Sequence, residues 1–290
     1  MHTRPIDAGN GLSFQAWIGG PPDGELVVLL HGFPQSRHSW RHQLPALEAA
    51  GYRTVAFDQR GYSPGARPDP GVPARPADSP YHLDRLVGDV LDVVDALGPA
   101  GRPFHLVGHD WGGMVAWTTA FRHPDRVASL AVLSRPHPLA FAAALDDDTG
   151  DQRHRSRHHR SFLDPDTGNR LLENDARRLR RLLRDGRVPQ PTIDDYVSVI
   201  GTAGAMDAAL AWYRALPGLA APVGPIRVPT LYVWGDEDPS VGRAAAEGTG
   251  AHVEGAFRFV ELTGVGHFAS DEQPEMVAGL LLQHLNGLAR

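Results

Sequence analysis

Apolar and polar residues alternate in blocks along the first half of the chain. Short, continuous apolar runs that end in glycine or a polar residue are typical of strands buried on both faces of a parallel sheet. Segments with helical periodicity separate these runs, and strand–helix alternation predicts a parallel sheet with helices on both faces. The predicted strands are "ELVVLLHG", "YRTVAFD", "FHLVGHD" and "VASLAVLS", and the predicted helices cover roughly residues 40–50, 83–97 and 113–123.

The alternation stops after Ser134. The segments "RPHPLAFAAAL" and "DDDTGDQRHRSRHHR" are predicted to be irregular, and no strand-like run occurs from about residue 138 to residue 221. Within that stretch "NRLLENDARRLRRLLRDG" predicts one helix and "IDDYVSVIGTAGAMDAALAWYRALPG" predicts two more. Strand signals return in "PTLYVWGDED" and "FRFVELTGVGH", before a closing helix "PEMVAGLLLQHLNG". The pattern predicts an α/β core of residues 1–137 and 222–290, interrupted by a helical cap of residues 138–221.

Composition narrows the class of protein. The 290 residues are 42% hydrophobic and 21% charged, as in an ordinary globular protein. A net charge of −6 gives no overall attraction to nucleic acid. We therefore interpret the Arg- and His-rich run 153–160 as a solvated surface of the cap and not as a nucleic-acid-binding patch. The first residues lack the apolar run of a secretory leader, and no apolar run is long enough to span a bilayer. We expect a cytoplasmic monomer or homodimer.

The candidate chemistry begins at Gly108-His109-Asp110-Trp111-Gly112. This segment has the spacing of a nucleophile elbow, G-x-S-x-G, with an aspartate in the place of the serine. Asp110 follows a predicted strand and precedes a predicted helix, which is the context that an elbow requires. The alternative is structural: an aspartate before a helix accepts backbone N–H groups as an N-cap.

Two later segments supply partners for Asp110. "LYVWGDED" ends a predicted strand with Asp236 and Asp238, and "LTGVGHFAS" ends the next with His267. Nucleophile, acid and histidine therefore occur in the chain order of α/β-hydrolase triads. A neutral imidazole can act as a base at pH 7, and a carboxylate can fix its tautomer.

A fourth segment, "LLHGFPQS", follows the first buried strand. A loop there can direct a backbone N–H at the nucleophile, and the residue after the nucleophile supplies a second. This predicts an oxyanion hole formed by the N–H groups of Phe33 and Trp111, with His31 as a scaffold of the loop.

The aspartate changes the expected reaction. A carboxylate has a pKa of about 3.9 and is already ionised at pH 7. Its attack on a saturated carbon gives an alkyl ester, which a histidine-activated water can then cleave at the acyl carbon. A serine ether would not be released in this way. The sequence therefore predicts opening of an epoxide or displacement of a halide, followed by hydrolysis.

Together these motifs resemble a known family. The matching segments are "HGFPQS", "DQRGYS", "VGHDWGG", "YVWGDED" and "GVGHF". They resemble the α/β-hydrolase epoxide hydrolases and the related haloalkane and haloacid dehalogenases, over almost the whole chain. The resemblance implies the α/β-hydrolase fold, makes Asp238 rather than Asp236 the charge-relay acid, and implies no metal or organic cofactor. His154 and His158 could face a metal at helical spacing, but no third ligand accompanies them.

The leaving group separates these branches. The family's epoxide hydrolases place two cap tyrosines over the nucleophile, and the resemblance maps the second to Tyr213 in "LAWYRAL". It places His159 of "HRSFL" in the slot of the first, and a slip of one residue would exchange it with His158. Fluoroacetate dehalogenases carry an arginine after the nucleophile, where this chain has Trp111. Haloalkane dehalogenases carry an asparagine where this chain has Phe33.

We therefore expect an epoxide hydrolase acting on a small-molecule epoxide and water. A dehalogenase using the same nucleophile is the alternative. A non-catalytic binding protein on a hydrolase scaffold is a third reading, but pure binding would not need His267 with Asp238.

Overall fold

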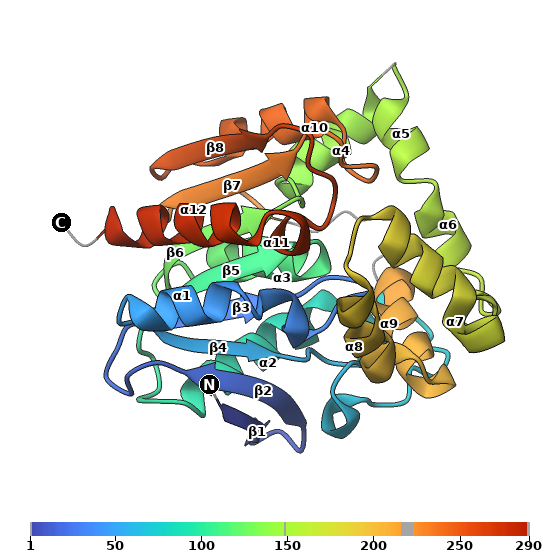
Figure 1. The fold of residues 1–290 in the computed structure, drawn as a ribbon, viewed down its shortest axis with the longest axis horizontal. Coiled ribbons are helices and arrows are strands. Elements are labelled where there is room, and N and C mark those ends of the chain that lie inside the picture. The colour runs from blue at the N-terminus through green and yellow to red at the C-terminus, as the bar shows by residue number, and fades with distance from the viewer. Residues whose placement is uncertain (1, 148, 216–222, 289–290) are drawn as a thin grey trace.

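A single twisted sheet forms the centre of the protein (Figure 1). The computed structural model describes residues 2–147, 149–215 and 223–288. The eight strands lie in the order β1-β2-β4-β3-β5-β6-β7-β8, and those from β3 to β8 run parallel. The strands are β1 (His2–Asp7), β2 (Ser13–Gly19), β3 (Leu26–Leu30), β4 (Arg53–Phe57), β5 (Phe104–His109), β6 (Val127–Leu133), β7 (Thr230–Gly235) and β8 (Phe257–Leu262). The predicted parallel sheet is confirmed.

The antiparallel pair at the N-terminal edge was not predicted. β1 pairs with β2, and β2 pairs antiparallel with β4. Only alternate residues of β2 are well buried, and "HTRPID" of β1 contains a proline and charged residues. An edge hairpin with one solvated face has no continuous apolar run, so it lacks the signal that identified the inner strands.

Two hydrophobic layers cover the two faces of the sheet. Along β3, Val28 and Leu30 face one layer, whereas Val27 and Leu29 face the other. Alternate side chains of a strand point to opposite faces, so a strand buried on both faces must be apolar throughout. The first layer contains α2 (Leu83–Asp95), α3 (Trp111–Arg122) and α10 (Arg243–Gly248), and the second contains α1 (Gln43–Ala49), α11 (Ala269–Glu272) and α12 (Pro274–Asn286).

Every element described between β6 and β7 is helical. The predicted long helix is α7, whose backbone leaves helical geometry at residues 173–176, and the two helices expected after it are α8 and α9. The expectation that residues 135–160 are irregular is wrong, because three helices begin in them; Pro138 starts the first, at a position where a proline needs no N–H partner. The helices are α4 (Pro138–Asp146), α5 (Asp151–Arg155), α6 (His158–Phe162), α7 (Thr167–Asp185), α8 (Gln190–Ile200) and α9 (Ala203–Ala215).

These helices lie partly over the core and partly beside it. α4 packs against α10, whereas α6 to α9 form a group at the carboxyl ends of the central strands (Figure 1). The proposed cap boundary at 221 lies outside the described residues. No helix in the part of the chain that the structure describes is long and apolar enough to cross a membrane.

Candidate active site

A cavity of about 670 Å³ lies between the carboxyl ends of the strands and the helices above them. Open α/β sheets bind ligands at this edge. Asp110 and His267 line the cavity from the core, and Tyr213 lines it from α9. The sheet thus brings together residues that are far apart in the sequence, as the chain order of the motifs predicted.

Asp110 sits on a strained turn between β5 and α3. Its backbone has φ 50° and ψ −117°, a conformation that a non-glycine residue adopts at a cost. Its side chain makes no capping hydrogen bond to α3. Instead, Oδ1 accepts the backbone N–H of Phe33 at 2.9 Å. The Asp110 carboxylate therefore does not cap the N-terminus of α3, which was the structural alternative for this residue.

Glycines on both sides of the turn permit this geometry. A Cβ added to Gly32 would lie 2.4 Å from the Asp110 Cβ, and one added to Gly112 would lie 2.4 Å from the Leu30 carbonyl oxygen. Both distances are below van der Waals contact with groups that cannot move aside. A Cβ added to Gly108 would lie 2.4 Å from the Gly112 carbonyl oxygen, so the spacing of these two glycines in the sequence reflects a close approach of backbone segments.

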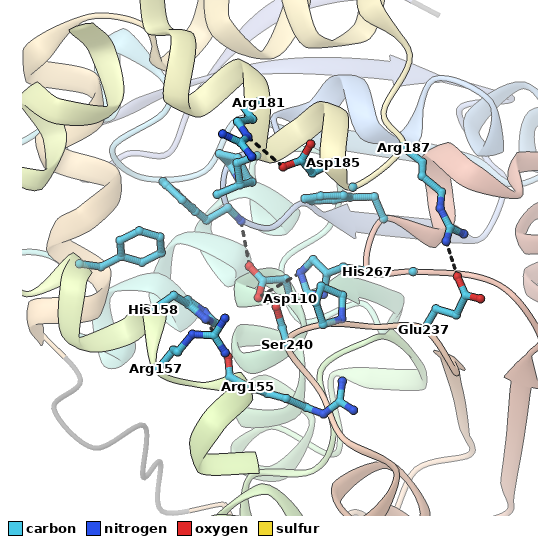
Figure 2. Close-up of a pocket in the computed structure, with 18 of the residues that line it drawn as sticks. Asp110, Arg155, Arg157, His158, Arg181, Asp185, Arg187, Glu237, Ser240 and His267 are labelled. Carbon is cyan, nitrogen blue, oxygen red and sulfur yellow. Dashed lines mark hydrogen bonds and ion pairs between the residues drawn. The ribbon is translucent and has the colours of Figure 1, made fainter. Parts of the chain in front are cut away.

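His267 lies between two carboxylates (Figure 2). Its Nε2 is 3.8 Å from Asp110 Oδ2, and its Nδ1 is 3.0 Å and 3.1 Å from the two oxygens of Asp238. Asp236 is turned away and accepts the backbone N–H of Gly264 at 2.7 Å. Of the two acids at the end of β7, Asp238 is the one in contact with the imidazole.

Two positioning residues were missed in the sequence. Ser134, with φ 64°, donates its hydroxyl to Asp238 Oδ2 at 2.6 Å, and its oxygen lies 2.9 Å from His267 Nδ1. His109 Nε2 lies 2.8 Å from the carbonyl oxygen of His267, which fixes the loop that carries the imidazole. Their position in the sequence could have identified them, because Ser134 and His109 are polar residues at the carboxyl ends of buried strands.

The carboxylates decide the charge of His267. Burial lowers the pKa of its imidazole, but Asp238, with a smaller contribution from Asp110, outweighs burial and raises the pKa to about 9. Conversely, burial raises the pKa of Asp238, but the facing His267 and its hydrogen bonds bring it below the ordinary value. In the free protein at pH 7, His267 is therefore an imidazolium held by two carboxylates.

The raised pKa of His267 makes the stability of the folded protein depend on pH. A folded-state pKa above the unfolded value of 6.5 contributes stability that is complete below pH 6.5 and is lost as the pH rises through about 9. In Asp110→Ala one source of the raised pKa is absent, so we expect His267 to titrate below the value in the original protein. NMR titration of the imidazole, assigned with His267→Gln, measures this. An unchanged pKa in Asp110→Ala would contradict the coupling.

The oxyanion-hole prediction rests on two N–H groups. The Phe33 N–H already contacts Asp110. Trp111 is the first residue of α3, where an N–H has no partner within the helix. Its role stays a prediction. Fully buried His31 scaffolds this loop: its Nε2 accepts the Gln59 N–H at 3.1 Å, and its Nδ1 lies 3.0 Å from the carbonyl oxygen of Gly32.

The cap contributes a tyrosine and a histidine. The Tyr213 ring packs 4.9 Å from Trp111 and 5.7 Å from Phe33, and burial raises its pKa well above the usual value. His158 lines the cavity, whereas His159 lies behind it, 5.4 Å from the Tyr213 ring. Adjacent residues of a helix point about 100° apart, and this angle distinguishes the two histidines. The lining of the cavity favours His158 over the predicted His159 for this position, and the role of either histidine stays a prediction.

No group of three or more metal-ligating side chains is poised to hold a metal ion among the described residues. His158 Nδ1 instead lies 3.0 Å from the carbonyl oxygen of Arg155.

Comparison with known proteins places this site in a family. The sequence pattern of the alpha/beta hydrolase fold matches residues 25–274. Epoxide hydrolase A of Mycobacterium tuberculosis (strain ATCC 25618 / H37Rv) is 32% identical over 98% of this chain and 97% of its own length. Epoxide hydrolase 4 of Mus musculus is 34% identical over 94% of this chain and 76% of its own length. The structure of a Bacillus megaterium epoxide hydrolase in complex with an inhibitor superposes with a TM-score of 0.85 and 27% identity, covering 98% of this chain and 100% of that one.

The fold and the site define an α/β hydrolase. The chain belongs to the epoxide hydrolase branch of the α/β-hydrolase family, as the resemblance of its motifs predicted.

Proposed function

We propose that this hydrolase opens an epoxide to a vicinal diol through an alkyl ester on Asp110. The observation that carries the proposal is the pairing, across one cavity, of a carboxylate at the elbow with the buried phenol of Tyr213. A carboxylate nucleophile suits a saturated carbon, and a phenol suits a leaving group that departs as an alkoxide.

In the first step Asp110 attacks a carbon of the epoxide, and the C–O bond to that carbon breaks. The Phe33 N–H holds Oδ1, and Oδ2 lies toward His267. Tyr213 transfers its proton to the oxygen as it becomes an alkoxide. Since burial raises the pKa of Tyr213, the phenol keeps its proton until a strong base of this kind forms.

His158 makes a weaker donor than the resemblance implied for its slot. Burial lowers its pKa, so its imidazole is neutral at pH 7. In the neutral ring the Nδ1 proton goes to the carbonyl oxygen of Arg155, and Nε2 is then an acceptor. We infer that Tyr213 is the main proton donor, and that His158 donates only when protonated, at acidic pH.

In the second step water cleaves the ester. Formation of the ester removes the charge of Asp110, and with it one cause of the raised pKa of His267. His267 gives its proton to the Tyr213 phenolate, which restores the phenol. The imidazole is then neutral and, oriented by Asp238, takes a proton from water. The hydroxide attacks the ester carbonyl, and the N–H groups of Phe33 and Trp111 hold the oxyanion. Collapse releases the diol and regenerates Asp110.

The proton balance closes on the residues of the site. One water is consumed for each epoxide, and no step requires a metal or an organic cofactor. The assignment of residues 1–137 and 222–290 to the core and 138–221 to the cap belongs to the same proposal. A cytoplasmic location and a monomeric or homodimeric state stay predictions of the sequence.

A substrate panel tests the function. We expect the purified protein to convert a terminal aryl epoxide to its diol, and to release no halide from chloroacetate, fluoroacetate or a 1-haloalkane. Chromatography of the diol and ion chromatography of halide measure the two reactions. Halide release without diol would decide for a dehalogenase instead.

Tyr213→Phe sharpens the same experiment. Removal of the only neutral proton donor of the proposed mechanism should lower diol formation by roughly 10²–10⁴-fold. Tyr52→Phe is a matched control, since its hydroxyl bonds Asn286 outside the cavity. Equal rates in the two variants would remove Tyr213 from the mechanism.

A further inference from the structure

The cavity is more basic than the protein as a whole. The chain carries a net charge of −6. The cavity nevertheless is lined by more arginines than acids, even with the nucleophile counted among the acids. The arginines are Arg155, Arg157, Arg178, Arg181 and Arg187, and the acids are Asp110, Asp185, Glu237 and Glu272. Figure 2 labels Arg155, Arg157, Arg181 and Arg187 around Asp110 and His267.

Each acid of the outer wall already has an arginine partner. Asp185 is 3.4 Å from Arg181. Glu237 and Glu272 both pair with Arg187, the latter at 3.4 Å. The three acids of the outer wall therefore share two arginines and leave one negative charge, which is fewer than the two positive charges of the lining arginines that remain.

Arg155 is also neutralised. It pairs with Asp151 at 2.9 Å and donates to the carbonyl oxygen of Asp238 at 2.6 Å. Its guanidinium is thus held against the core, below the outer wall.

Two arginines remain, Arg157 beside α6 and Arg178 on α7, and we name them the outer arginine pair. Within the described residues neither forms an ion pair; Arg157 donates only to the carbonyl oxygen of His154, at 3.0 Å. Arg178 follows the interruption of α7 at residues 173–176, in the first turn of the second half of the helix. The positive end of a helix dipole disfavours a cation, so the position of Arg178 favours an anion from outside.

The inner wall has the opposite character. Phe33, Phe162 and Phe268 line the same cavity and are buried, whereas the outer arginine pair is exposed. A substrate that fills this cavity therefore meets an apolar surface next to Asp110 and positive charge farther out.

We propose that the preferred substrates are epoxides with an apolar body and a carboxylate at the far end. The outer arginine pair binds the carboxylate while the apolar body fills the inner wall and the epoxide reaches Asp110 and Tyr213. This inference rests on the proposed epoxide hydrolysis and concerns the same cavity. The arginines act on binding and touch no reacting atom.

The test compares two epoxides of equal size. One is an aryl glycidyl ether with a para-carboxylate, and the other is its para-carboxamide. We expect kcat/KM to favour the carboxylate by about ten-fold at low salt, from two exposed charge pairs. The preference should decline as salt screens the charges.

The double variant Arg157→Ala/Arg178→Ala should bring the ratio of the two kcat/KM values to about one. Arg160→Ala/Arg177→Ala is the matched control, because it removes the same charge from α6 and α7 at exposed residues outside the cavity wall. That control should keep the full preference. Diol formed from the carboxamide shows that each variant is folded.

The outcomes separate the two claims. Equal kcat/KM for both epoxides in the original protein, or a preference that survives in Arg157→Ala/Arg178→Ala, overturns the substrate class and leaves epoxide hydrolysis intact. Loss of the preference in the control variant also overturns it, because total charge would then be the cause. Absence of turnover with either epoxide overturns the proposed function, and this inference with it.

Discussion

Asp110→Ala is expected to abolish epoxide turnover, with a loss of at least about 10⁴-fold in kcat. Asp110 is the only group in the proposed mechanism that forms a bond to carbon, and no neighbouring side chain can replace it. Asp238, the other carboxylate in contact with His267, lies on the far side of the imidazole from Asp110 and is fully buried. Diol formation measures the loss, and the mass of the intact protein after mixing with epoxide shows whether an ester has formed.

The control for Asp110→Ala removes a different carboxylate at the same edge of the sheet. Asp236→Ala should retain most activity, since Asp236 bonds only the Gly264 loop and does not line the cavity. Turnover by Asp110→Ala within ten-fold of the original protein, or an ester carried by another residue in that variant, would disprove the assignment of the nucleophile.

His267→Gln is expected to stop the reaction halfway. The first step needs no base because the nucleophile is a carboxylate, whereas the second step needs an imidazole to deprotonate water. The ester should therefore form and persist, with hydrolysis slowed by roughly 10²–10⁴-fold. Mass spectrometry should find one epoxide mass added per chain, and peptide mapping should place it on Asp110. A stopped assay should give a single burst of consumed epoxide.

A buried histidine elsewhere provides the control for this variant. His105 lies at the other end of β5, where its Nδ1 is 2.8 Å from the Ser129 hydroxyl oxygen. His105→Gln should turn over without accumulating ester. If His267→Gln shows no mass increment with any reactive epoxide, or hydrolyses the ester at the original rate, the two-step mechanism is wrong.

The sequence located the reacting groups because the fold converts strand ends into neighbours. Asp110 and Asp238 each follow a buried strand and His267 follows the partly exposed strand β8, and parallel strands bring their carboxyl ends to one edge. Neither a contact nor a distance was needed for that prediction, only the alternation of elements and the order of the residue types.

Other features of the site could not be predicted, because they depend on backbone dihedral angles and side-chain directions that the residue pattern does not contain. Ser134 contacts Asp238 and His267 because its backbone turns back at φ 64°, and a serine after a strand is common. His158 and His159 differ by one step around a helix of five residues, too short to show periodicity. The two residues of the outer arginine pair come from different parts of the cap, beside α6 and on α7. Their lack of acidic partners depends on how the side chains pack, which the sequence does not show.

The origin of the two halves of the site in the chain has an evolutionary consequence. The proposed nucleophile, base and acid follow strands of the sheet, whereas Tyr213 and His158 come from the single stretch between β6 and β7. That stretch is one continuous segment of the chain. Recombination or insertion within this segment could therefore replace the residues that contact the leaving group, together with the cap residues that line the cavity. The attacking carboxylate would stay unchanged. New leaving groups would then become accessible without rebuilding the catalytic core.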